Sequence, residues 1–210
     1  MNSDQVTRCH YLGRSGNTGE LKLFLKDCPN IDQALAIIAQ YDNTKLLECF
    51  DHNQVKNWNW AFTEACHYSN NKVLEYLLQE NVDNFDDGLL RAARGGKLAN
   101  VKKLIELGGN SHQKAFLEAA EHGHVELMIH LKDKFEDIDI NQCESALISA
   151  CYGNQLSSVE YLLTCEVTNY NRGISACSEF FHYKDYLQEP VTEEDKETNT
   201  KIIELLQSKL

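Results

Sequence analysis

The stretch that decides the fold is "LEAAEHGHVELMIHL", residues 117–131. It contains two adjacent alanines, a glycine three residues after the second, and apolar residues that then recur three or four positions apart. The same arrangement occurs 27 residues earlier in "AARGGKLANVKKLI". A variant of it, with Cys151 and Asn154 in place of the second alanine and the glycine, occurs 31 residues later in "ACYGNQLSSVEYLL". A pattern that returns at a nearly fixed interval indicates a structural repeat rather than a single site.

We use the second alanine, Ala120, as the anchor of the pattern. Weaker copies occur in "ACHYSNNKVLEYLL", "AQYDNTKLLECF", "GRSGNTGELKLF" and "SACSEF". The anchors are residues 13, 39, 66, 93, 120, 151 and 177. On both sides of each anchor the apolar positions recur as on one face of a helix, with a turn between. The glycines at 16, 96 and 123 suit the left-handed residue that ends a helix.

Such short units cannot bury their apolar faces alone and must stack on one another. The sequence therefore predicts an all-α fold, an α-solenoid of about six to seven helix-turn-helix repeats. We expect residues 1–210 to form a single repeat domain.

The segments "AAEHGHVELMIHL" and "AARGGKLANVKKLIELGG" resemble ankyrin repeats, whose inner helix ends in paired alanines before a Gly-His turn. The resemblance runs from about residue 7 to 210. The family's Thr-Pro-Leu-His opening is absent, and the spacing is shorter than the usual length of about 33. The missing residues fall where the family has its β-hairpin finger, so we expect fingers that are reduced or absent. Short, proline-poor units of this kind resemble ankyrin-like proteins of large DNA viruses, amoebae and intracellular bacteria.

Three histidines in the deciding stretch raise the question of a metal site. His122 and His124 flank the glycine break, and His130 follows on the outer side of the next helix, so the three need not converge. For His124, the resemblance implies a structural hydrogen bond at the turn. The eight cysteines contain no CxxC pair, and we interpret them as reduced thiols. No nucleophile, phosphate-loop or metalloprotease motif occurs, so we expect no enzyme activity, cofactor or metal.

The net charge of −12 argues against a nucleic-acid partner, because phosphate binding needs clustered Lys and Arg. No apolar run reaches membrane-spanning length and no signal peptide is visible, so we expect no membrane association. The expected location is the cytoplasm, or the host-cell cytoplasm for a viral or bacterial effector.

Residues six and two before an anchor, and one or two after it, face away from the core of the expected stack. They predict a concave protein-binding surface, in which aromatic and arginine side chains are the usual hot spots. Alternatively, Trp58 or Trp60 could cover the edge of a neighbouring repeat. The candidates are Tyr41, Trp60, Glu64, His67, Tyr68, Arg91, Arg94, Glu118, His122 and Tyr152.

The last repeat contains an acidic insertion at residues 180–198, followed by a capping helix at 199–210. The insertion is either a solvated loop or a grafted interaction element. Its acid cluster, Glu189, Glu193, Glu194 and Asp195, would favour a basic partner.

These patterns predict a protein–protein interaction module or adaptor that binds a partner protein through its inner helices. The resemblance implies an effector that acts on a host protein. The alternative is an acidic decoy that mimics nucleic acid and blocks a basic, nucleic-acid-binding protein.

Overall fold

A computed structural model describes residues 1–68 and 71–210. It divides into two compact units, residues 1–110 and 111–210, each described by itself. The first unit contains α1 (Ser3–Ser15), α2 (Thr18–Lys26), α3 (Ile31–Ile38), α4 (Thr44–Leu47), α5 (Trp58–Tyr68), α6 (Asn71–Leu77), α7 (Phe85–Arg94) and α8 (Leu98–Glu106). The second contains α9 (His112–Glu121), α10 (Val125–Lys134), α11 (Ile140–Tyr152), α12 (Leu156–Leu163), α13 (Tyr170–Tyr186) and α14 (Glu193–Gln207). The described residues include no strand, so the all-α class without β-hairpin fingers is confirmed.

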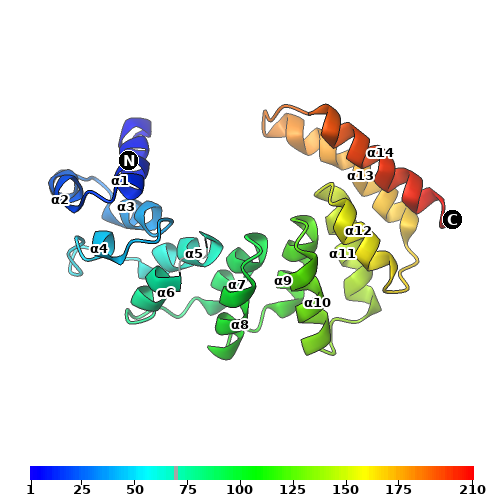
Figure 1. The fold of residues 1–210 in the computed structure, drawn as a ribbon, viewed down its shortest axis with the longest axis horizontal. Helices are drawn as coiled ribbons and strands as arrows, with labels where there is room; N and C mark the ends of the chain where they lie inside the picture. Colours follow the sequence, from blue (N-terminus) through cyan, green and yellow to red (C-terminus); the bar gives the residue numbers. More distant parts are fainter. Residues whose placement is uncertain (69–70) are drawn as a thin grey trace. The chain divides into compact units, whose positions relative to one another are not determined.

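Within each unit, odd-numbered helices form one layer and even-numbered helices form another. In the first unit α1, α3, α5 and α7 pack each against the next, and in the second unit α9, α11 and α13 do the same. Each even-numbered helix packs on the helix before it; Figure 1 shows α6 and α8 on one side of α5 and α7. We call the odd-numbered helices inner and the even-numbered helices outer. This is the stacking of helix pairs that the repeat pattern predicts.

The residues that face neighbouring inner helices are small. The seven anchors, at 13, 39, 66, 93, 120, 151 and 177, are all buried. Five positions before the anchor, five inner helices carry another buried small residue: Ala34, Ala61, Gly88, Ala115 and Ala146. A Cβ added at Gly88 would lie 2.9 Å from Cε1 of Phe62 and 3.1 Å from Sγ of Cys66. Successive inner helices are therefore too close for a larger side chain at this position.

In four of the helix pairs, the turn between the two helices places a left-handed residue three positions after the anchor. Gly16, Gly96 and Gly123 have φ values of 67°, 67° and 80°, as predicted. Asn154 occupies the same place with a φ of 56°, because asparagine tolerates this conformation better than other side chains. The corresponding Ser69 lies outside the described residues.

A polar side chain seven positions before the anchor holds the loop that follows the pair. Oδ1 of Asp32 accepts hydrogen bonds from the backbone N–H groups of Lys56 and Asn57, at 2.8 and 3.1 Å. Oδ1 of Asn59 accepts from the two equivalent N–H groups one repeat later. Asp86, Gln113 and Glu144 also bind the next loop, each through at least one backbone group. These side chains satisfy loop groups where a finger is missing.

The C-terminal pair differs from the loop that we expected at 180–198. Helix α13 continues to Tyr186 and α14 begins at Glu193, so only residues 187–192 separate them. Thr192 and Asp195 form a capping box, and the acids of the first turn favour the positive end of the helix dipole. The acid cluster therefore starts a helix, and the helix expected at 199–210 spans Glu193–Gln207 instead.

The eight cysteines are free thiols, and five of them are buried. Burial raises the pKa of Cys66, at an anchor position, to about 12. This thiol stays protonated at neutral pH and packs as a small apolar group.

Replacing Asp32 by Ala tests whether the polar side chains hold the loops. Asp32→Ala removes the acceptor of two backbone N–H groups, so the free energy of unfolding should fall by about 1 kcal/mol. Asp32→Asn keeps an acceptor oxygen and should stay within about 0.5 kcal/mol of the wild type. Urea unfolding measures both, and equal losses in the two variants would contradict the assignment.

Candidate functional site

Six of the predicted residues lie on neighbouring inner helices of the first unit. Four of them lie on one side of α5, because they are separated by four, three and one positions. They are Trp60, Glu64, His67 and Tyr68. Arg91 and Arg94 lie on α7, which packs against α5. We call these six residues the α5–α7 surface.

Glu64 links three inner-layer segments of the first unit. Its Oε1 lies 3.6 Å from Nη2 of Arg91, and its Oε2 accepts a hydrogen bond of 3.1 Å from Nε2 of Gln40. The Glu64 side chain is only 14% exposed, whereas that of Arg91 is 45% exposed. The carboxylate is thus held within the surface, and it fixes an arginine that solvent can reach.

His67 is fixed by the backbone of the neighbouring helix. Its Nδ1 lies 3.2 Å from the carbonyl oxygen of Arg91, and because a carbonyl only accepts, Nδ1 carries the proton. Burial lowers the pKa of His67; the bond to Arg91 opposes this, and the charges of Arg91 and Arg94 lower the pKa further. The imidazole is therefore neutral at pH 7.

Trp60 and Tyr68 leave large apolar areas open to solvent. Trp60 is 38% exposed and Tyr68 is 45% exposed. The edge of the Tyr68 ring meets the His67 ring at a centroid distance of 4.7 Å, which orients the phenol. Trp58 instead packs against His52 at 5.0 Å, so of the two tryptophans Trp58 is the one that covers a neighbouring segment.

Two tyrosines near the N-terminus have different environments. Tyr41 is half-buried: its hydroxyl lies 2.9 Å from Nδ1 of His10, and its ring fills the space beside Gly13. Tyr41 therefore helps to join the first two helix pairs. Tyr11, which is not among our candidates, is exposed. It lies two positions before the anchor at 13, and Glu64 and Arg91 have the same position relative to the anchors at 66 and 93. The repeat frame alone could have identified it.

The remaining candidates lie in the second unit. Glu118 and His122 are neighbours on and just after α9, where Nδ1 of His122 donates to the carbonyl of Glu118 at 3.0 Å. Tyr152, at the end of α11, packs against Tyr183 at a ring distance of 5.2 Å. His122 and Tyr152 are thus anchored within their own unit, and they form no part of the α5–α7 surface.

Two histidines of the deciding stretch, His122 and His124, lie at the turn, whereas His130 lies within α10. The backbone N–H of His124 donates to the carbonyl of Ala119 at 2.8 Å, and its carbonyl accepts from Met128 in the first turn of α10. The rings of His122 and His124 stack at 6.5 Å. Within residues 1–68 and 71–210, no group of three or more His, Cys, Asp or Glu side chains could hold a metal ion.

The charge of the chain is distributed unevenly between the two units. Residues 1–110 contain 12 Lys and Arg and 14 Asp and Glu, a net charge of −2. Residues 111–210 contain 8 Lys and Arg and 18 Asp and Glu, a net charge of −10. The α5–α7 surface therefore belongs to a nearly neutral unit and itself carries two arginines and one glutamate.

Comparison with known families agrees with the helix pairs and their anchors. Residues 89–172 match a family described as ankyrin repeats in three copies. This part of the chain therefore contains ankyrin repeats. Ankyrin repeats are in general protein-interaction modules and are typically not enzymes. The match therefore supports the prediction of a protein–protein interaction module. No curated protein matches the chain. In the part of the chain that the structure describes, no helix is long and apolar enough to cross a membrane.

The lowered pKa of His67 predicts that the stability of this protein depends on pH. As the pH falls, His67 takes up a proton near its ordinary pKa of 6.5 in the unfolded chain. In the folded protein it takes up the proton only at a lower pH. The contribution of His67 to the free energy of unfolding is therefore fully present above pH 6.5, and it is lost as the pH falls through the pKa of the folded state.

His67→Gln removes this titration but keeps a side-chain donor for the carbonyl of Arg91. Between pH 7 and pH 5 the variant should lose less unfolding free energy than the wild type, measured by urea unfolding at each pH. Identical losses would contradict the neutral state of the half-buried His67.

Proposed function

We propose that the chain is an adaptor whose protein partner docks on the α5–α7 surface. The observation that carries this proposal is the exposure of Trp60 and Tyr68 beside Arg91, an arginine held in place by Glu64. Tryptophan, tyrosine and arginine are the residues that most often dominate binding energy at protein interfaces.

The surface is also favourable because most of its side chains are already positioned. Glu64 is held by Gln40 and Arg91, and His67 is held by the backbone of α7. A partner would therefore order few additional side chains, which reduces the entropy lost on binding. Tyr11 extends the same row of inner-helix positions and is a further candidate for contact.

The resemblance to the repeat proteins of viruses and intracellular bacteria supports an effector role, in which the partner is a host protein in the host-cell cytoplasm. Glu118, His122 and Tyr152 stay candidate protein-binding residues of the second unit by itself. The repeat scaffold holds its fold with one set of positions and selects partners with another, so partner identity must come from binding experiments.

The acidic-decoy alternative has its own support in the charge of −10 on residues 111–210. A decoy would bind a basic protein through long-range attraction, and its affinity would fall steeply with salt. Docking on Trp60 and Tyr68 buries apolar area, and its affinity should change little with salt.

The test is capture of partners from host-cell lysate on the immobilised chain, followed by affinity measurement with the captured protein. Trp60→Ala combined with Tyr68→Ala should weaken binding at least about tenfold. The matched control is Leu23→Ala, which removes an exposed apolar side chain from outer helix α2.

Two results would contradict the proposal. One is unchanged affinity in the Trp60 and Tyr68 double variant. The other is a salt dependence so steep that a modest rise in ionic strength abolishes binding, which would favour the decoy.

A further inference from the structure

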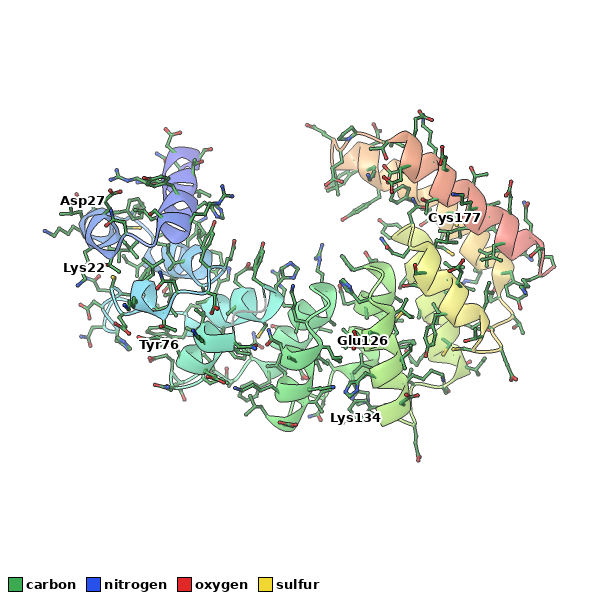
Figure 2. The ribbon with its side chains drawn as sticks, in the orientation of Figure 1. Lys22, Asp27, Tyr76, Glu126, Lys134 and Cys177 are labelled. Carbon is green, nitrogen blue, oxygen red and sulfur yellow. The ribbon has the colours of Figure 1, made fainter. Side chains whose placement is uncertain are left out.

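The last inner helix continues far beyond the point where the others turn. In α7, α9 and α11 the helix ends at the anchor or one residue after it, whereas α13 runs nine residues past its anchor, Cys177, to Tyr186. Figure 2 labels Cys177, and Figure 1 shows that α13 and α14 are longer than the two helices before them. The insertion in the last repeat has therefore lengthened a helical hairpin.

The extension exposes a row of large apolar side chains. Tyr183, Tyr186 and Leu187 are 38%, 82% and 43% exposed. They are separated by three and one positions, so they lie on one side of the helix. Tyr152, on the preceding inner helix, packs against Tyr183 and lengthens the row. We call these four residues the α13 stripe.

The extension is tied down by residues beside the stripe, so the stripe is held in one place. Phe180 is buried, and Nζ of Lys184 lies 5.4 Å from the centre of its ring. The same Nζ donates to Oδ2 of Asp195 at 2.9 Å, which joins α13 to α14. The side chain of Asn154 donates to the carbonyl of Asp195 at 3.0 Å, which joins both to the preceding pair.

The segment that carries the stripe is rich in acidic residues. Residues 178–197 include seven Asp and Glu and only two lysines, and both lysines are paired: Lys184 with Asp195, and Lys196 with Glu193 at 2.7 Å. Glu179, Asp185 and Glu189 are exposed on or directly after α13. Burial chiefly raises the pKa of Tyr152, and the negative charges of Glu121 and Glu179 raise it further. An exposed apolar row within an acidic field matches a partner that is both apolar and basic.

We propose that the α13 stripe docks a basic amphipathic helix of a partner protein. The apolar side of that helix would cover Tyr183, Tyr186 and Leu187, and its Lys or Arg side chains would face Glu179, Asp185 and Glu189. This mode uses apolar residues three or four positions apart as anchors, with charges that fix orientation. The site is separate from the α5–α7 surface and does not depend on the function proposed for it.

The experiment measures binding of three fluorescein-labelled peptides to the full chain by anisotropy. The first is a Lys/Leu peptide patterned as an amphipathic helix; the second has Ser in place of every Leu; the third has Glu in place of every Lys. We expect the Lys/Leu peptide to bind at least about tenfold more tightly than either of the others. Equal binding of the Lys/Ser peptide would reduce the interaction to charge alone and overturn the proposal.

Two variants locate the site. Tyr186→Ser combined with Leu187→Ser should weaken the Lys/Leu peptide about tenfold, whereas the control Leu23→Ser should bind as the wild type does. The double variant at Trp60 and Tyr68 should also bind this peptide normally, so failure here and failure of the α5–α7 surface are distinguishable. Unchanged affinity in the Tyr186 and Leu187 variant, with unchanged circular dichroism, would overturn the proposal.

A second variant keeps the proposal testable if the first unfolds. Asp185→Asn combined with Glu189→Gln retains the stripe and removes two charges. It should weaken the peptide about threefold and flatten the salt dependence of binding. No change in either quantity would overturn the proposal.

Discussion

The close approach of successive inner helices is the constraint on which the rest of the structure depends. Two positions after the anchor, a Cβ on Gly95 would collide with the backbone carbonyl of His67, and one on Gly153 would collide with that of Glu121. Backbone cannot move aside as a flexible side chain can, so these positions require glycine. Together with the small residues at and before the anchors, they determine which part of each inner helix faces its neighbours.

That constraint separates packing residues from surface residues within a single helical turn. Ala92 is fully buried between helices, whereas its neighbour Arg91 points to solvent and is held by Glu64. A side chain on such a rigid helix is presented to a partner with little freedom left to lose. The same principle applies to the α13 stripe, where Phe180 and Lys184 hold the helix and Tyr186 remains exposed.

Features that recur at fixed spacing could be predicted from the sequence. The anchors and the left-handed glycines repeat with the apolar pattern, so the positions of Gly96 and Gly123 in their turns follow from the amino-acid sequence alone. Glu64 and His67 were identified as inner-helix positions, but their bonds to Arg91 join different helices and have no local signal in the sequence.

Features that depend on distant partners were missed. Asp32 and Asn59 are one repeat apart, yet their hydrogen-bond partners lie 24 or 25 residues away, and nothing local marks them. The acid cluster near Asp195 is typical of a solvated loop, and it forms the first turn of α14 because Thr192 and the helix dipole favour it there. Tyr11 was missed although the repeat frame contained it.

The most direct test of this account compares leucine substitutions at two adjacent residues, Ala92 and Arg91, by urea unfolding. Ala92→Leu should lower the free energy of unfolding by about 1–3 kcal/mol, because Ala92 is fully buried and the extra carbons overpack the core. Arg91→Leu should change it by no more than about 0.5 kcal/mol, since the side chain is on the surface. Equal losses at the two positions would contradict the separation of packing from binding residues on the inner helices.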